Sequence, residues 1–312
     1  MSIASALVIG ESLIDVLPGV GDLAGGSPMN VAVGLARLGR LTMLATWFGR
    51  DSHGQLIDDH LRASGVELVP GSDGAAHTST AAVTFDEAGT AHYVFDLKWQ
   101  MPAPPDGLAP VVAHTGSIGA ALQPGADQAL DALRRLKPRC MVSYDPNVRP
   151  QIIGPADGVR ALTERFVGAA DIVKASDEDM AWLYPHTDPH ASARSWLGAG
   201  PSLVVLTKGA AGVTAMSHAA TVDVPAPHVT LADTVGAGDS LMAALLDGVW
   251  SLGLLDANRR DDMASTPSST LERLMRYAST AAGITLSRPG ADPPWRAELP
   301  ALRTPSGSAT GA

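Results

Sequence analysis

Short apolar runs alternate with amphipathic stretches along most of this chain. The apolar runs at 6–10 and 41–49 predict buried strands, and the segments 27–39 and 52–65 predict the helices that follow them. Strands that alternate with helices at this spacing are typical of a parallel sheet covered by helices on both faces.

The helix predicted at 27–39 carries signals at both of its ends. Ser27 suits an N-cap, Pro28 suits the first helical position, and Gly39 suits the C-terminal stop. The same alternation continues in the second half of the chain. It predicts strands at 113–119, 140–147, 171–176 and 202–209, a hairpin at 211–226, and helices at 126–137, 158–169, 177–184, 274–287 and from 237 onward.

One segment interrupts this alternation. Residues 78–97 form two extended runs around the turn sequence DEAGT, which predicts a hairpin in a small sheet over the main domain. The polar segment 256–272 is predicted to be a surface connection, and the tail 301–312 is predicted to be loose.

Composition and charge exclude several classes of protein. The chain has 312 residues, of which 46% are hydrophobic and 17% charged, as in a soluble globular protein. A formal net charge of −10 argues against a nucleic-acid-binding surface. Asp239 and Asp247 lie in the most apolar window, which argues against a membrane span. We therefore expect a cytoplasmic protein in which the single cysteine, Cys140, is a buried strand thiol.

Several common catalytic motifs are missing from the sequence. It contains no P-loop, no dinucleotide-binding glycine pattern after its first strand, and no complete nucleophile elbow at TGSIG. His186 and His190 have helical spacing, but Pro185 and Pro189 flank them and favour a polar loop over a zinc site.

The sequence DTVGAGDS, at 233–240, opens the apolar helix that starts at Ala237. Amides at a helix N-terminus favour anions, and Gly236 and Gly238 allow a close approach to the backbone. Asp239 would repel a bound phosphate, but it is useful where an attacking hydroxyl must lose a proton. A simple capping role for Asp239 is equally compatible with the spacing.

Six stretches together resemble the ribokinase-like (PfkB) carbohydrate kinase family. Besides DTVGAGDS, they are GGSPMNVAVGLARLG with FGRDSHG, then YDPNVRP, DIVKASDEDM, VVLTKGAAGV and ITLSRPGADPP, all in the family's order. The resemblance runs from Leu7 to Pro294, and GGSPMNVAVGLARLG and YDPNVRP look most like the corresponding stretches of bacterial fructokinases. The family resemblance implies a three-layer α/β/α sandwich at 1–300. It also implies a mostly parallel central sheet and a small β lid from about 11–24 and 77–98.

This resemblance also implies a reaction. The protein would transfer the γ-phosphoryl group of ATP to a primary hydroxyl of a small sugar, with D-fructose as the expected substrate. Asp239 would be the general base, and Gly236, Ala237 and Gly238 would form an anion hole. The residues expected to bind the sugar are Asp15, Gly25, Gly26, Asn30, Lys98, Trp99 and Arg149. For Trp99, stacking on the sugar and simple packing in the lid are both open.

Nucleotide and metal sites follow from the same resemblance. The residues that match nucleotide-binding positions are Ser176, Thr207, Lys208, Gly209, Gly212 and Ser279. Mg²⁺ would be held mostly by ATP phosphates and water, with Asp179 acting through water. Asp233, Val235 and Gly290 match a monovalent-cation (K⁺) site.

Two positions depart from the family's pattern. Where the family has Asn-x-x-Glu, this chain has Ser176 and Asp179, and the side chain of Asp179 is one carbon shorter than that of glutamate. Ser279 stands where many family members carry an asparagine near the adenine.

Two alternative functions remain open from the sequence. The first is a kinase for ribose or for a sugar acid such as 2-keto-3-deoxygluconate. A sugar acid would need a cation for its carboxylate, which Arg149 or Lys98 could supply. A protein of another class would sense a sugar or nucleotide without turnover. An exposed lid sheet is also a candidate surface for a homodimer.

Overall fold

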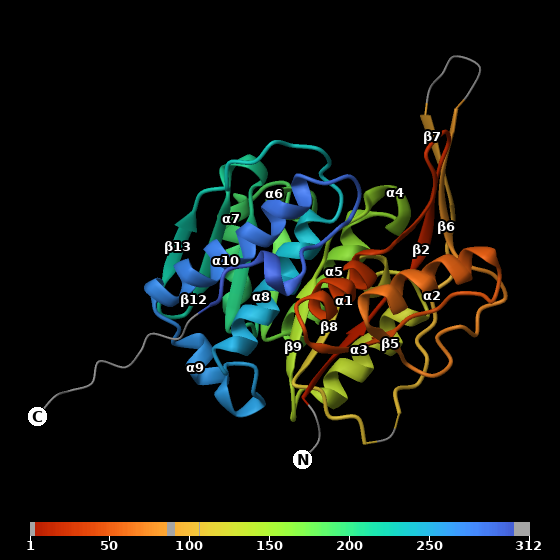
Figure 1. Cartoon of the computed structure of the whole chain (residues 1–312). Helices are drawn as coiled ribbons and strands as arrows, with labels where there is room; N and C mark the ends of the chain where they lie inside the picture. The colour runs from red at the N-terminus through yellow and green to blue at the C-terminus, as the bar shows by residue number, and fades with distance from the viewer. Residues whose placement is uncertain (1–3, 86–90, 106, 303–312) are drawn as a thin grey trace, which may run out of the picture.

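A nine-stranded sheet forms the centre of the computed structural model, which describes residues 4–85, 91–105 and 107–302 (Figure 1). The strand order is β13-β12-β11-β10-β9-β8-β1-β4-β5. The bounds are β1 Ser5–Ile9, β4 Leu41–Ala45, β5 Val66–Leu68, β8 Val112–Gly116, β9 Met141–Asp145, β10 Ile172–Ser176, β11 Leu203–Thr207, β12 Val213–Ser217 and β13 Thr221–Val224.

Neighbouring strands are parallel from β5 through to β11, which confirms the mostly parallel sheet. The exception is β12, which pairs antiparallel with both β11 and β13 and forms the hairpin predicted at 211–226. Parallel order places the carboxyl ends of β1, β8, β9, β10 and β11 at the same edge of the sheet, where open α/β sheets bind ligands.

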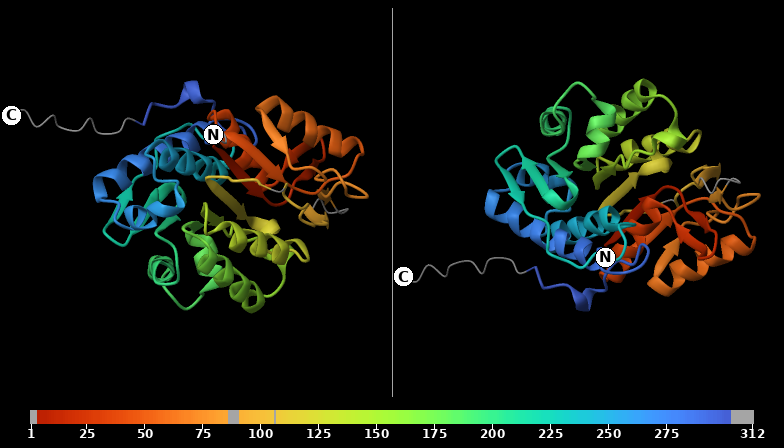
Figure 2. Two further views of the ribbon diagram at one scale, coloured as in Figure 1. Left: turned by 90° about the horizontal axis from the view of Figure 1, so that it is seen from below. Right: turned by 90° about the horizontal axis from the view of Figure 1, so that it is seen from above.

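Helices cover both faces of this sheet, as Figure 2 shows in views from below and above. The bounds are α1 Ser27–Arg37, α2 Ser52–Ser64, α3 Gly125–Leu136, α4 Pro150–Ile153, α5 Ala156–Ala169, α6 Asp177–Leu183, α7 Pro189–Leu197, α8 Ala237–Ser251, α9 Arg260–Ala264 and α10 Ser268–Leu286. Helices α1, α8 and α10 share one buried cluster with one face of the sheet, and α3, α5, α6 and α7 share another with the opposite face. The predicted three-layer α/β/α sandwich is therefore confirmed.

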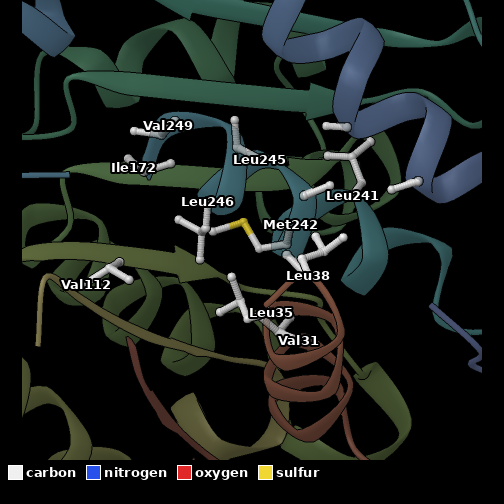
Figure 3. Packing of buried hydrophobic residues seen from close by; sticks show 14 of the residues in the cluster. Val31, Leu35, Leu38, Val112, Ile172, Leu241, Met242, Leu245, Leu246 and Val249 are labelled. Carbon is white, nitrogen blue, oxygen red and sulfur yellow. The ribbon is translucent and has the colours of Figure 1, made fainter. Parts of the chain in front are cut away.

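Close packing between α1 and α8 fixes the geometry that matters for function. Val31 and Leu35 of α1 lie beside Met242 and Leu246 of α8 (Figure 3). A Cβ atom built on Gly34 would lie 2.6 Å from Cβ of Ala243, so the glycine permits the close approach of the two helices. This contact places the first turn of α1 against the first turn of α8.

A separate four-stranded sheet, which we call the lid, stands beside the main sheet (Figure 1). Its order is β3-β2-β6-β7, with β2 Leu13–Leu17, β3 Gly21–Gly25, β6 Thr80–Phe85 and β7 Ala91–Asp96. Its two pairs of strands come from the predicted lid segments, while the turn predicted at 86–90 lies outside the described residues. The exposed apolar residues of the lid include Leu23 in β3, Val94 in β7 and Val20 in the turn between β2 and β3.

The structure differs from the sequence prediction in several places. Helix α7 begins at Pro189, so His190 is helical although a polar loop was predicted there. Gly26, and not Ser27, is the N-cap of α1, because the Ser27 hydroxyl bonds to a different helix. The segment predicted as a surface connection contains α9, and α10 begins there at Ser268. Residues 303–312 of the predicted loose tail lie outside the described residues. Among the described helices, none combines the length and apolarity needed to cross a bilayer.

Candidate active site

A cavity of about 810 Å³ lies between the lid and the carboxyl ends of the central strands. Backbone and side chains from β2, β3, β6, β7, α1 and α8 line it, together with the loops after β1, β8 and β9. Its polar and charged wall residues are Glu11, Asp15, Ser27, Asn30, Ser117, Asn147, Arg149, Gln151, Lys174, Glu178, Asp233, Thr234 and Asp239.

Asp239 lies in the first turn of α8 but does not cap that helix. The N-cap is Gly236, and among the described residues no side chain caps the first turn. One carboxylate oxygen of Asp239 accepts a hydrogen bond from the Ser27 hydroxyl at 2.7 Å, and the other accepts one from the Asn30 amide at 2.8 Å. Both donors belong to α1, so the capping interpretation that the sequence left open is wrong.

The environment of Asp239 tunes its basicity in two opposing ways. Burial raises the pKa of this carboxyl above its ordinary value, because the charged form is poorly solvated. The hydrogen bonds from Ser27 and Asn30, and the charges of Lys174 and Arg149, act in the opposite direction. The result is a buried carboxylate at a cavity wall whose proton affinity is increased, as general-base work requires.

The three residues before Asp239 leave the helix amides accessible. Gly236 has a φ of 75°, in the left-handed region that favours glycine. A Cβ atom on Gly236 would also lie 2.6 Å from Cβ of Ala291. Gly236 and Gly238 line the cavity, and Ala237 is the first residue of α8, so the segment predicted as an anion hole borders the same space as Asp239.

A buried ion pair beside this segment was missed by the sequence analysis. The Lys174 ammonium lies 2.8 Å from a carboxylate oxygen of Asp145, and both side chains are at most 5% exposed. A Cβ atom on Gly238 would lie 3.4 Å from Lys174 Nζ. Burial alone would lower the pKa of Lys174, but the adjacent carboxylates, chiefly Asp145, raise it. The lysine is therefore a charged cation at the mouth of α8.

The sequence contained a signal for this pair. Lys174 is a charged residue within the otherwise apolar strand sequence DIVKAS, and Asp145 ends the neighbouring strand β9. Since β9 and β10 are parallel neighbours, a lysine and an aspartate near their carboxyl ends come together.

On the lid side, the structure brings together most residues predicted to bind the sugar. Asp15, Gly25, Gly26 and Asn30 line the cavity, as does Arg149 from the loop after β9. A Cβ atom on Gly25 would lie 2.6 Å from the Asp15 carboxylate, so the glycine leaves room for that side chain. Burial raises the pKa of Asp15, and the charge of Arg149 opposes that shift.

Two predicted sugar contacts are wrong. Trp99 is buried to 3% exposure and belongs to the main-domain core, where its indole N–H donates to the Gly119 carbonyl at 2.9 Å. Its ring packs over Gly125, so neither stacking on a sugar nor packing within the lid describes it. The side chain of Lys98 is exposed and lies outside the cavity wall. The Lys98 N–H donates to the Ser79 hydroxyl, which donates to the Lys98 carbonyl, and these two bonds fix the backbone there.

All but one of the predicted nucleotide-binding residues lie at the carboxyl ends of β10 and β11 or in the turn after β11, outside the cavity wall: Ser176, Thr207, Lys208, Gly209 and Gly212. Thr207 pairs in register with Ser176, and Gly209 and Gly212 have positive φ angles in the turn that follows. Lys208 forms an ion pair with Asp223 at 2.8 Å. Ser279 is 6% exposed on α10 and does not line the cavity, and its adenine contact stays a prediction.

Asp179 and Ser176 form a capping box at the start of α6. One carboxylate oxygen of Asp179 accepts the Ser176 N–H, the other accepts the Val148 N–H at 2.7 Å, and the Ser176 hydroxyl accepts the Asp179 N–H. Within the described ranges, no cluster of three or more His, Cys, Asp or Glu side chains is arranged to hold a metal ion. A Mg²⁺ ion that is held mainly by ATP phosphates and water does not need such a cluster, and its binding stays a prediction.

The three residues matched to a monovalent-cation site lie together. Asp233 accepts hydrogen bonds from the backbone N–H groups of Val235, at 3.1 Å, and Gly290, at 2.8 Å. These bonds lower the pKa of Asp233, so its carboxylate is ionised near neutral pH. The carboxylate thus joins the loop before α8 to the loop after α10 at the cavity edge.

Removing one donor to Asp239 is expected to change the pH dependence of turnover. In Ser27→Ala the ionised carboxylate loses one hydrogen bond, so its pKa rises further. A base must be ionised to accept a proton, and the acidic limb of a kcat–pH profile is therefore expected to move to higher pH. Ser195→Ala, on α7 outside the cavity, is the control and leaves the limb in place. An unshifted acidic limb in Ser27→Ala would contradict the predicted role of Asp239 as the general base.

The chain matches a family of known carbohydrate kinases. The model for the pfkB family of carbohydrate kinases matches residues 11–298. A fructokinase from Rhizobium leguminosarum bv. trifolii is 34% identical over 255 residues, which is 77% of this chain and 78% of that protein.

Two solved structures share the fold. A fructokinase from Xylella fastidiosa with bound ATP aligns with a TM-score of 0.76 at 24% identity, over 96% of this chain and 95% of the other. A double-mutant fructokinase from Vibrio cholerae, with fructose, ADP and potassium ion bound, aligns with a TM-score of 0.71 at 24% identity over 93% and 94%. The protein described here belongs to the pfkB family of carbohydrate kinases and is an enzyme of that class.

Proposed function

We propose that this enzyme is an ATP-dependent fructokinase. The observation that carries the proposal is the Asp239 carboxylate, buried and held by Ser27 and Asn30, at the point where the amides of α8 open into the cavity. A base and an anion-binding helix end at one place match the needs of phosphoryl transfer to a hydroxyl group.

The mechanism follows from the positions of these groups. The sugar binds between the lid and the sheet, with a primary hydroxyl at the Asp239 carboxylate. Asp239 accepts the hydroxyl proton as the oxygen attacks the γ-phosphorus of ATP and the bond to the ADP oxygen breaks. The amides of Gly236, Ala237 and Gly238 bind the charge on the transferred group. Lid closure excludes water, which would otherwise compete as the acceptor.

Lys174 contributes a fixed positive charge to the same transfer. Its ammonium lies beside Gly238 and is held by Asp145, so it needs no reorganisation when the phosphoryl group arrives. A preorganised cation in a site shielded from water stabilises developing negative charge far more than it would in bulk solvent.

Several details of this proposal rest on the family and on relatives. ATP as phosphoryl donor is supported by the ATP-bound Xylella structure, and the nucleotide is proposed to lie along Thr207, Lys208 and the turn after β11. Magnesium would accompany the ATP phosphates, where it screens their charge. A potassium site is proposed at Asp233, and the solved structure of the Vibrio enzyme contains a bound potassium ion.

Fructose is proposed because of the names of the relatives and the charge of the cavity. The fructokinase from Rhizobium leguminosarum bv. trifolii shares 34% identity with the chain. A sugar acid would need a cation, but Lys98 lies outside the cavity, and Lys174 lies beside Gly238, where we propose that it serves the transferred phosphoryl group. Among the described wall residues the other cation is Arg149, whose charge acts on the carboxyls of Glu11, Asp15 and Asp239. A neutral sugar therefore suits a wall in which carboxylates outnumber cations.

The lid is proposed to form a homodimer surface. Val94 of β7 and Val20 in the turn between β2 and β3 are exposed and do not line the cavity, and exposed apolar residues on a small sheet favour association. We also propose that the enzyme acts in the cytoplasm, where its nucleotide and sugar substrates are available.

A substrate panel tests the proposed function. Release of ADP is measured with purified enzyme, ATP and each of D-fructose, D-ribose, adenosine and 2-keto-3-deoxygluconate. The proposal predicts the highest kcat/KM for D-fructose. A higher kcat/KM for any of the other three would overturn fructose as the substrate while leaving the kinase assignment intact.

A further inference from the structure

Asp179 stands where the family carries the glutamate of its Asn-x-x-Glu motif, and the resemblance implies that it acts on magnesium-bound water. The structure gives its carboxylate other partners. One oxygen accepts the Val148 N–H at 2.7 Å, and the other accepts the Ser176 N–H at 2.8 Å. Asp179 is 7% exposed and lies outside the cavity wall, whereas the exposed Glu178 in the same turn lines the cavity. A buried carboxylate with both oxygens bonded to backbone amides does not fit the role of holding metal-bound water.

The Val148 N–H belongs to the loop that connects β9 to α4. Val148 is 8% exposed, and its side chain belongs to the buried cluster beneath one face of the central sheet. Its neighbours in the loop and in α4 form a continuous part of the cavity wall: Asn147, Arg149, Gln151 and Ile152. The bond from Val148 to Asp179 therefore fixes a segment that faces the cavity on either side of the bonded amide.

This loop has a backbone conformation that needs support. Asn147 has a φ of 38°, in the left-handed region that residues other than glycine seldom adopt. Such conformations persist where the surrounding structure imposes them, and they gather at ligand sites. On one side of Asn147, Asp145 is paired with Lys174 of β10. On the other side, the Val148 N–H is bonded to Asp179 of α6.

We propose that Asp179 is a positioning residue that holds the loop after β9 in the conformation that binds the sugar, and that it does not act on the magnesium ion. The proposal rests on the proposed function, because it takes a sugar as the ligand of the cavity. A buried backbone N–H that loses its acceptor carries a desolvation penalty, so the loop is expected to leave this conformation when the carboxylate is altered. The effect then falls on sugar binding, even when neither nucleotide nor metal is present.

Equilibrium binding of D-fructose, measured by calorimetry in EDTA without nucleotide, tests the proposal. In Asp179→Asn the amide offers one acceptor oxygen where the carboxylate offers two, so one of the two backbone N–H groups loses its partner. The dissociation constant for D-fructose is expected to rise about tenfold. The Mg²⁺ concentration that gives half-maximal ADP release, with ATP and D-fructose saturating, should stay at the native value.

Asp179→Glu introduces the residue of the family motif and separates the two roles. A side chain that served the metal would gain reach, so the Mg²⁺ requirement would fall and fructose binding would stay native. In the proposed role, the extra methylene group displaces the carboxylate from the Val148 N–H, because the site is buried and closely packed. Fructose binding is then expected to weaken as in Asp179→Asn. This variant keeps the charge, and it provides the same test if Asp179→Asn does not fold.

Asp188→Asn is the matched control. Asp188 is an exposed carboxylate that caps the next helix, α7, by accepting the Ala191 N–H at 2.9 Å, and this variant should bind D-fructose as the native enzyme does. Melting temperatures verify that each variant is folded. Native fructose binding, or a changed Mg²⁺ requirement, in a folded Asp179 variant overturns the proposal. Absence of fructose binding by the native enzyme would instead overturn the proposed function.

Discussion

Asp239→Asn is expected to lower kcat by about 10²–10⁴-fold, the usual contribution of a general base. Asparagine has nearly the same shape, but it cannot accept the proton of the attacking hydroxyl. The dissociation constants for ATP and fructose should stay within about threefold of the native values, because the new carboxamide has nearly the size of the carboxylate and repels neither substrate. Steady-state ADP release and equilibrium binding measure the two effects.

Asp131→Asn is the matched control for this variant. Asp131 is an exposed residue of α3, far in sequence from the site and absent from the cavity wall. The same change of carboxylate to amide there should leave kcat unchanged. Near-native turnover in Asp239→Asn would show that the hydroxyl loses its proton elsewhere.

The paired variant Lys174→Gln/Asp145→Asn is expected to lower kcat by about 10²–10³-fold while the protein stays folded. Lys174→Gln alone would leave the buried Asp145 carboxylate without its partner, at a cost of about 3–5 kcal/mol in the free energy of unfolding. Replacing both residues removes both charges and keeps their volumes, and such neutral replacements of buried pairs are often tolerated.

This design separates a catalytic cation from a structural ion pair. If the pair only stabilises the fold, the paired variant should turn over fructose at close to the native rate. Lys137→Gln is the control, because Lys137 lies 3.5 Å from the buried Asp171 at the opposite end of β10. Thermal unfolding confirms that each variant is folded before kcat is compared.

The sequence predicted most of the fold because the layers follow from periodic patterns. Apolar runs and amphipathic segments identified the parallel sheet, and the interrupted alternation at 78–97 identified half of the lid. Helix α9 was missed because its segment, DANRRDDMAS, is mostly polar and contains only short apolar stretches. The assignment of Ser27 as an N-cap failed because tertiary contact with Asp239 competes for the hydroxyl.

The site was predicted in part, and the failures have a common physical cause. Motifs identify which residues leave a strand at the ligand edge, but they do not show the direction of a side chain. Trp99 and Lys98 are adjacent to the lid in sequence, yet one turns into the core and the other into solvent. Glu11 and Lys174 were missed because each is a single charged residue in or directly after an apolar strand. What distinguishes them is their burial, which the sequence does not show.

Fructose-dependent ADP release by the purified native protein tests the central claim most directly. With ATP in excess, one ADP is expected for each fructose consumed, and release should fall to background when fructose is omitted. Tight fructose binding without fructose-dependent ADP at millimolar ATP would contradict the account and would favour a sugar-sensing protein instead.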